Sequence, residues 1–326
     1  MVLATPRPLF AAIDVGTNAA RIELAQLSPG GVLERVFKER EAICPGEGVF
    51  ARGSMSPEAV ERLVNTLRRY AERCRRHDAR VRAVATSALR DARNQAKVLR
   101  RVREETGLEL EVVSGEEEAR LICLGVLHRT PVRERSLLVD IGGGSTEIVL
   151  ATGERPQGLW SLPLGAVRLT QHFDTSAEVP SAQLRRMRED IDARLRESLP
   201  GFVPRLPRVA LGSSGTIRAV VDFAAREAGE GASQEQLTRA VETLARMSPR
   251  ERRGHFEDRR ADIIVAGALL LERVVRHLGV ERVLAVKRGL RDGVLVDLLA
   301  REELVSRPKS AEATPSHRRA TGSRGA

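Results

Sequence analysis

The stretch Val139–Ala151 reads VDIGGGSTEIVLA, and the earlier stretch Ala12–Ala25 reads AIDVGTNAARIELA. Aligned on their aspartates, the two copies share Asp14/Asp140, Gly16/Gly142, Ile22/Ile148, Leu24/Leu150 and Ala25/Ala151 at a constant offset of 126 residues. Each copy has the pattern of a buried apolar strand, an acid at its end, a tight glycine-containing turn and a second strand. A unit that recurs one domain apart predicts two duplicated halves facing each other across a cleft.

The sequence around these copies alternates helix and strand patterns, which predicts α/β halves. Ser56, Pro57 and Glu58 form a helix start, and apolar residues follow at helical spacing to Cys74. Further helices are predicted over 93–105, 114–128, 181–199, 216–228, 235–246, 260–278 and 291–303, and strands over 81–85, 108–113, 159–162, 208–211 and 282–286. We place an N-terminal domain at 1–128, a C-terminal domain at 129–305 and a tail at 306–326, and leave open whether the last helix packs back on the first domain.

Length and composition exclude several classes of protein. A chain of 326 residues with 42% hydrophobic residues is long enough for two domains with real cores. The longest apolar run, Ile263 to Leu271, is too short for a bilayer, which needs about 20 residues. No secretory signal is visible, and the three cysteines form neither a disulfide framework nor a zinc pattern. We therefore expect a cytoplasmic protein without a membrane span.

The charge balance favours an anionic partner. Lys and Arg number 54 against 44 acids, a net charge of +10. The tail at 306–326 has five basic residues, one acid and no large apolar residue, so we expect it to be disordered. The positive charge of the remaining chain attracts anions. Because aromatic residues make up only 3%, stacking platforms for bases are scarce, and the charge indicates phosphate binding and not nucleic-acid recognition.

Three short segments combine small residues with hydroxyl groups. They are Gly16-Thr17-Asn18, Gly142-Gly143-Gly144-Ser145-Thr146 and Gly212-Ser213-Ser214-Gly215-Thr216. Glycines let backbone N–H groups approach phosphate oxygens, and Ser and Thr hydroxyls add donors. Two of the loops follow a strand-end aspartate, so Asp14 and Asp140 are candidate ligands for a hydrated Mg²⁺ between the phosphates.

Seven stretches together carry a resemblance to a known family. They are AAIDVGTNAAR, VATSALRDARN, VVSGEEEARLICLGV, LLVDIGGGSTEIVLA, SLPLGAVRLT, LGSSGTIRAVV and RRADIIVAGALLLE. The chain resembles the exopolyphosphatase / guanosine pentaphosphate phosphohydrolase (Ppx/GppA) family of the sugar kinase–Hsp70–actin superfamily. This resemblance implies two RNase H-like, actin-like ATPase domains with the active site in their cleft. It also implies Mg²⁺-dependent removal of terminal phosphate from inorganic polyphosphate or from the guanosine nucleotide pppGpp.

The resemblance also implies roles for single residues. The family motif places the catalytic glutamate directly before Ala119, so Glu118 is the expected general base. Glu117 remains an alternative, although its spacing from Ser114 fits a capping box and assigns it a structural role. Arg21 and Arg90 resemble phosphate ligands of the family, and Glu147 resembles an acid of its metal shell.

The chain departs from the family pattern at two positions and in one module. Ala19 stands where the family usually has Ser, and Lys287 occupies a position that is commonly small or acidic. We also expect the helical HD domain of longer members to be absent, and similar proteins are often homodimers. The function expected is that of an exopolyphosphatase. A pppGpp 5′-phosphohydrolase, a kinase of the same superfamily and a non-catalytic regulator that binds polyphosphate or nucleotide are the alternatives.

Overall fold

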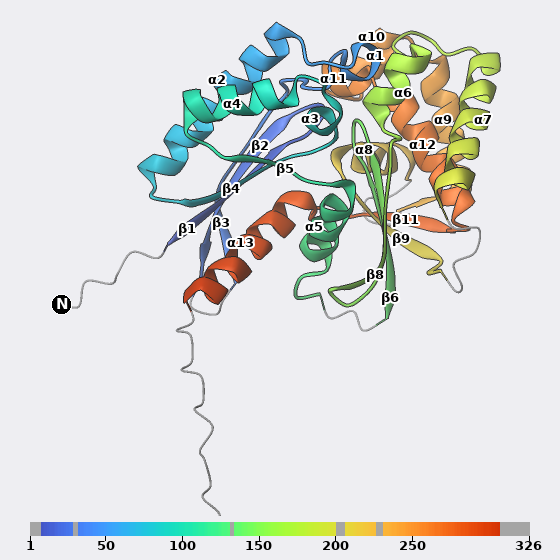
Figure 1. Cartoon of the computed structure of the whole chain (residues 1–326). Coiled ribbons are helices and arrows are strands. Elements are labelled where there is room, and N and C mark those ends of the chain that lie inside the picture. The colour runs from blue at the N-terminus through green and yellow to red at the C-terminus, as the bar shows by residue number, and fades with distance from the viewer. Residues whose placement is uncertain (1–7, 29–31, 131–133, 200–205, 226–230, 307–326) are drawn as a thin grey trace, which may run out of the picture.

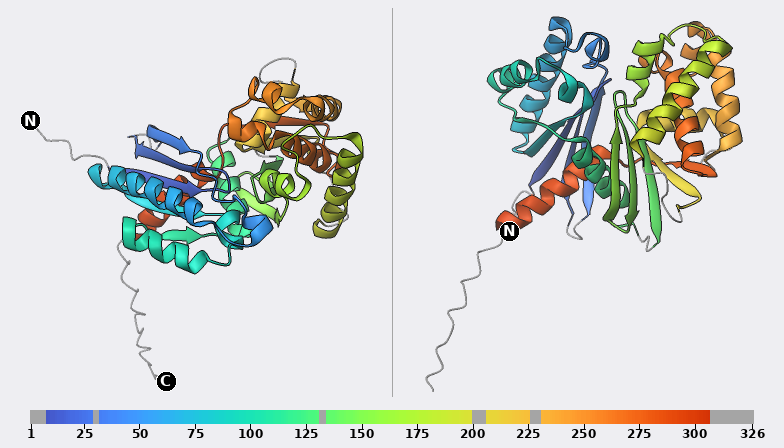
Figure 2. Two further views of the ribbon diagram at one scale, coloured as in Figure 1. Left: turned by 90° about the horizontal axis from the view of Figure 1, so that it is seen from above. Right: turned by 45° about the vertical axis from the view of Figure 1, so that its right-hand side comes forward.

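The computed structural model describes residues 8–28, 32–130, 134–199, 206–225 and 231–306 of the chain (Figure 1). Two sheets with helices packed on their faces lie side by side in the views of Figure 2. No helix among the described residues is both long and apolar enough to cross a bilayer. The tail predicted at 306–326 lies outside the described residues, except for Ser306, which ends the last helix.

The first sheet has five strands in the order β3-β2-β1-β4-β5. They are β1 (Leu9–Val15), β2 (Ala20–Leu27), β3 (Leu33–Glu41), β4 (Arg80–Ala85) and β5 (Leu110–Val112). β1, β2 and β3 pair antiparallel, whereas β4 and β5 extend the sheet in parallel. Its helices are α2 (Pro57–Arg76), α4 (Gln95–Thr106) and the short α1 (Val49–Arg52) and α3 (Ser87–Asp91).

The second sheet has six strands in the order β10-β11-β9-β6-β7-β8. They are β6 (Arg135–Ile141), β7 (Thr146–Thr152), β8 (Arg155–Leu162), β9 (Val209–Ser213), β10 (Ala232–Ser233) and β11 (Arg282–Ala285). In order and direction, β6, β7, β8, β9 and β11 repeat β1, β2, β3, β4 and β5. The predicted fold class of two duplicated α/β halves is therefore confirmed.

Helices of the second half share one large apolar core with its sheet. They are α6 (Ala166–Phe173), α7 (Ser181–Ser198), α8 (Gly215–Ala224), α9 (Gln234–Arg246) and α12 (Ile264–His277). α12 is buried along most of its length, since its apolar run packs against helices and the sheet. This explains why the longest apolar stretch of the sequence belongs to a core helix.

Some elements differ from the sequence prediction. Strand β3 was not expected, because this edge strand carries a mixture of charged and partly exposed residues in place of a clear apolar face. The helix expected over 260–278 is interrupted, so that α11 (Asp258–Ala261) precedes α12. The helices α1, α3, α6 and α10 (Pro249–Arg253) were also missed, and all but α6 are too short to show a helical period.

Two helices pack closely against each other between the halves, with glycines at their contact. α13 (Leu290–Ser306) follows the second sheet in sequence yet packs against β1 and against α5 (Gly115–Leu127). A Cβ on Gly293 would collide with the carbonyl oxygen of Leu121, and a Cβ on Gly125 with that of Gly289. Because no side chain separates the two backbones here, α13 crosses the second half of α5 at close range.

Replacing Gly293 with Ala is expected to lower the free energy of unfolding by about 1–3 kcal/mol or more, the usual cost of overpacking. The added methyl group meets backbone, which cannot rotate away as a side chain can. Thermal or urea unfolding measures the effect. Gly254→Ala is the comparison, because Gly254 has helical backbone angles and a new Cβ would need the Glu251 carbonyl oxygen, at 3.1 Å, to move by only a few tenths of an ångström. Equal stability of both variants would contradict this packing.

Candidate active site

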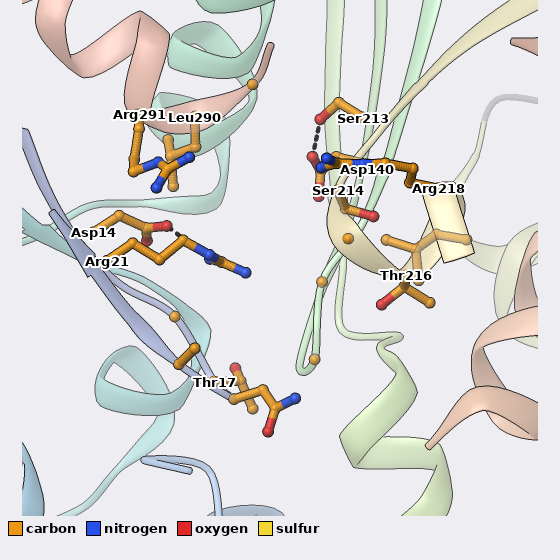
Figure 3. Close-up of a pocket in the computed structure, with 18 of the residues that line it drawn as sticks. Asp14, Thr17, Arg21, Asp140, Ser213, Ser214, Thr216, Arg218, Leu290 and Arg291 are labelled. Carbon is orange, nitrogen blue, oxygen red and sulfur yellow. Dashed lines mark hydrogen bonds and ion pairs between the residues drawn. The ribbon is translucent and has the colours of Figure 1, made fainter. Parts of the chain in front are cut away.

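A cavity of about 440 Å³ lies between the two sheets. Figure 3 shows Asp14, Arg21 and Arg291 on one wall, with Asp140 and Ser213 on the wall opposite. Loops at the ends of β1, β6 and β9 contribute many of the lining residues. The predicted site residues found in the lining are Asp14, Gly16, Thr17, Asn18, Arg21, Glu118, Asp140, Gly142, Gly143, Gly144, Ser145, Ser213, Ser214, Gly215 and Thr216. The departures Ala19 and Lys287 line it as well.

The duplicated units place different side chains at equivalent positions. In the first unit Asp14 pairs across the strands with Arg21, and Arg21 Nη1 donates to Asp14 Oδ2 over 2.9 Å. In the second unit the partner of Asp140 is Glu147, so an acid stands where the first unit has a cation. Asp140 instead accepts a hydrogen bond from Ser213 of the neighbouring strand β9. A symmetric fold therefore builds a chemically asymmetric site.

The loops that combine glycines with hydroxyl groups approach one another closely. A Cβ on Gly143 would lie 2.8 Å from the Cβ of Thr17, so only glycine lets the loops of the two halves meet here. In the third loop, Ser214 has φ 81° and ψ 157°, a conformation almost restricted to glycine. Its hydroxyl accepts from the backbone N–H of Ile217 and caps α8. Such strain, typically about 1–3 kcal/mol, is characteristic of functional loops.

Glu118 is the carboxylate of α5 that lines the cavity. It is 7% exposed, and its Oε2 accepts from Arg90 Nη1 over 3.1 Å. Burial raises the pKa of Glu118 to about 7 against the opposing charge of Arg90, and Asp140 and Asp14 raise it further. A carboxylate with a pKa near neutrality is well matched to accept a proton from water.

Glu117 points away from this cavity. Its carboxylate accepts from Arg120 and Arg82, in a network that includes Asp297 of α13. Ser114 Oγ accepts from the backbone N–H of Glu117, as the capping-box spacing predicted. The second hydrogen bond of a capping box, from the backbone N–H of Ser114 to the Glu117 side chain, is not formed. The Glu117 side chain pairs with arginines instead. Between the two glutamates, the structure thus places Glu118 alone in the lining.

Four predicted site residues lie outside the lining of this cavity. Thr146 is fully buried, and its hydroxyl donates to the Leu164 carbonyl. Gly212 lies within β9, where a Cβ would meet Ile217. Glu147 lies behind the cavity, where Ser161 Oγ donates to its Oε1 over 2.8 Å. Arg90 reaches the site only through Glu118 and lines a second cavity.

The buried acids fit a divalent cation. Glu147 Oε2 is buried without a hydrogen-bond partner, and burial together with Glu118 and Asp140 raises its pKa well above the usual range. Burial also raises the pKa of Asp140 to about 6, with Asp14 adding to the shift. In the described part of the chain, no group of three or more His, Cys, Asp or Glu side chains is placed to hold a metal ion by itself. Mg²⁺ suits this arrangement, because it keeps waters and binds through one or two carboxylates and substrate phosphates.

Cations that lie far apart in the sequence converge at the mouth of the cavity, and no sequence motif predicted them. Beyond Arg21 and Lys287, its lining contains Lys38, Arg40, Arg218, Arg260, Arg288 and Arg291. The guanidinium of Arg260 lies beside Gly215, at the start of α8. Burial lowers the pKa of Arg260 to about 10, and Arg40, Arg21 and Arg218 lower it further against the attraction of Glu257. These cations come from β3, α8, α11, the segment before α13 and the start of α13, so no local motif could have revealed their convergence.

A family model described as the Ppx/GppA phosphatase family matches residues 24–302. The chain belongs to the Ppx/GppA phosphatase family. Exopolyphosphatase 1 of Mycobacterium bovis is 31% identical over 303 residues, which cover 89% of this chain and 88% of that protein. The resemblance inferred from the seven motifs and the predicted class of enzyme, a phosphoanhydride hydrolase, are confirmed.

Solved structures of the family share its fold. A family member from Aquifex aeolicus superposes with a TM-score of 0.75 at 28% identity, over 91% of this chain and 99% of that one. An exopolyphosphatase from Cytophaga hutchinsonii gives 0.80 at 25% identity, over 90% and 98%. A nucleoside triphosphate hydrolase from Neospora caninum, at 11% identity and a TM-score of 0.52 over 91% and 93%, shares the fold alone. The two halves of this Ppx/GppA protein are thus duplicated actin-like domains.

Proposed function

We propose that this Ppx/GppA protein is a cytoplasmic exopolyphosphatase that releases the terminal phosphate of inorganic polyphosphate by Mg²⁺-dependent hydrolysis. The observation that carries the proposal is the crowding of cations at the mouth of the cavity. Burial lowers the pKa of Arg260 to about 10, and the nearby charges of Arg40, Arg21 and Arg218 lower it further. Eight Lys and Arg side chains line the cavity against six Asp and Glu side chains, and this excess of positive charge favours a polyanion.

The lining favours an inorganic chain over a nucleotide. Among the described residues that line the cavity, none is Phe, Tyr or Trp. A guanine base binds most readily where an aromatic ring or another flat surface offers stacking. Polyphosphate needs only cations and N–H donors along its length, and this cavity supplies both. The name of the mycobacterial relative, exopolyphosphatase 1, agrees with this choice.

In the proposed reaction, the cavity holds one end of the chain with its terminal phosphorus facing Glu118. The Glu118 carboxylate accepts a proton from water as the water oxygen attacks phosphorus, and the bond to the bridging oxygen of the next phosphate breaks. Arg90, 3.1 Å from Glu118 Oε2, keeps enough of the carboxylate ionised to act as a base. Backbone N–H groups of the glycine loops and Arg21 stabilise the charge that develops on the phosphoryl oxygens.

Asp14 and Asp140 are the residues that would hold Mg²⁺, directly or through its waters, with Glu147 behind them. When bound, the ion neutralises charge on the phosphates and orients them for in-line attack. Asp14 is kept in place by Arg21 and Asp140 by Ser213, so both carboxylates are oriented before substrate arrives.

Phosphate release from long-chain polyphosphate, compared with release from pppGpp at equal concentrations and with Mg²⁺ present, tests the proposal. We expect the larger kcat/KM on polyphosphate. Faster release from pppGpp would assign the chain to pppGpp hydrolysis. Binding of polyphosphate without any phosphate release would make it a regulator.

The cations at the mouth make a separate prediction. Arg260→Gln is expected to raise KM for long-chain polyphosphate about tenfold, the effect of losing about 1.4 kcal/mol of binding, with kcat little changed. The slope of log KM against log salt concentration is expected to fall by about 1, because binding through one fewer cation releases fewer counterions from polyphosphate. Arg246→Gln, at an exposed position of α9, is the matched control. An unchanged KM in Arg260→Gln would show that these cations do not bind polyphosphate.

A further inference from the structure

A second cavity, of about 350 Å³, adjoins the active site. One side comes from α3 and the start of α5, with Ser87 and Arg90 among the lining residues. The other side comes from the end of β8 and from α6, with Ser161 and Arg168. The cavity thus lies between the two halves of the molecule, as the main cavity does.

Only a few side chains separate the two cavities. Ser145 lines both of them. Arg90 lines the second cavity, and its Nη1 lies 3.1 Å from Oε2 of Glu118, which lines the first. Ser161 lines the second cavity and donates to Glu147 behind the first. The contacts between the two linings therefore include the Arg90–Glu118 ion pair, which lies beside the carboxylate proposed to activate water.

The second cavity contains groups that suit a small anion. Ser87 is 2% exposed, and its Oγ has no hydrogen-bond partner although it is buried. The guanidinium groups of Arg90 and Arg168 add donors. An unsatisfied buried hydroxyl costs folding free energy, and an anion bound against Ser87 would accept the hydrogen bond that this hydroxyl can donate.

The affinity of this cavity for an anion is expected to be low. Arg90 is already paired with Glu118, and Arg168 with Asp91, and the exposed Glu116 adds a further acid to the rim. The positive charges are thus balanced by acids, in contrast to the cation cluster of the main cavity. A cavity that offers donors but little net charge can accept an orthophosphate ion and release it again.

We propose that the second cavity is the route by which orthophosphate leaves the active site while the shortened polyphosphate chain remains in the main cavity. The inference rests on the proposed exopolyphosphatase function. After each cleavage, the remaining chain fills the cation-lined mouth, and the freed phosphate lies between that chain and Glu118. Exit through the mouth would require the chain to dissociate. Exit past Arg90 and Ser87 lets the chain advance and undergo the next cleavage.

Two variants, Glu116→Trp and Pro163→Trp, each narrow the second cavity by placing an indole ring at its rim. Both residues are exposed, so the added ring has room without disturbing a core. Acid quench measures all phosphate cleaved, whereas a fluorescent phosphate sensor measures only phosphate set free. On long-chain polyphosphate, we expect cleavage of the first equivalent at the unmodified rate. Steady-state release should then slow about tenfold or more, as is usual when product release limits turnover.

Tripolyphosphate supplies the internal control. Its short remainder dissociates after cleavage and clears the mouth, so both Trp variants should turn it over at the unmodified rate. Glu104→Trp, which adds the same bulk at an exposed position of α4 outside the linings of both cavities, should behave like the unmodified chain on both substrates. Equal loss on long and short substrates, or no loss on either, would overturn the exit route. Failure of the unmodified chain to release phosphate from polyphosphate would instead overturn the proposed function.

Discussion

Glu118→Gln is expected to lower the turnover of polyphosphate by about 10²–10⁴-fold, the usual contribution of a general base. The substitution keeps the size of the side chain and a hydrogen-bond acceptor for Arg90, but the amide cannot take a proton from water. Binding of polyphosphate should persist or tighten, because a negative charge beside the phosphates has been removed. Single-turnover hydrolysis and equilibrium binding measure the two effects separately.

Glu117→Gln is the matched control, one residue away on the same helix. Its carboxylate accepts from Arg120 at 2.6 and 2.9 Å and from Arg82 at 3.3 Å, outside the cavity. We expect unchanged turnover and a loss of stability on the order of 1 kcal/mol from weaker ion pairs. If Glu117→Gln loses turnover and Glu118→Gln loses only stability, the base has been assigned to the wrong residue. If both variants stay active, the hydrolytic mechanism is wrong.

Asp140→Asn is expected to lower turnover by about 10²–10³-fold. A divalent cation stabilises a phosphoryl transition state by several kcal/mol, and about 1.4 kcal/mol corresponds to a factor of ten. The stability of the metal-free fold should rise, whereas turnover falls. Because burial raises the pKa of Asp140 to about 6, its ionised form costs folding free energy at pH 8, and the neutral amide removes that cost. The metal-free variant should therefore melt at a higher temperature than the unmodified chain.

The response to Mg²⁺ separates a ligand from a structural residue. Mg²⁺ should raise the melting temperature of the unmodified chain by mass action and have much less effect on Asp140→Asn. Asp78→Asn is the control, since Asp78 has φ 47°, which Asn tolerates, and lies at the exposed end of α2. Near-normal turnover of Asp140→Asn, with the Mg²⁺ response intact, would contradict the role given to the duplicated aspartates.

Local patterns in the sequence were sufficient for the duplication and most of the elements. Asp14 and Asp140 occur in the same strand–turn–strand pattern, and a pattern with period two and a glycine turn depends on neighbouring residues alone. For the same reason the helix starts at Ser56 and Ser114 were predicted, and both hydroxyls accept the capping hydrogen bond. The strand at 33–41 was missed because an edge strand with charged residues on both faces lacks a diagnostic period.

The position of side chains around the cleft was decided by tertiary packing. Glu117 and Glu118 are neighbours on one helix, about 100° apart around its axis. Which of them faces the cavity depends on the crossing of α5 with α13, a segment that lies far along the chain. Likewise Arg40 and Arg260 come from opposite halves of the molecule and meet only when the two sheets face each other.

The sequence by itself thus determined the two duplicated halves, the loops at their strand ends and the acids beside them, because each depends on spacing within a short segment. Only the tertiary structure decided that Glu118 enters the cavity, that Thr146 and Gly212 stay out of its lining, and that scattered arginines converge at its mouth. The physical reason is that burial and electrostatic interaction depend on distance in space, and folding brings together residues that no sequence spacing relates.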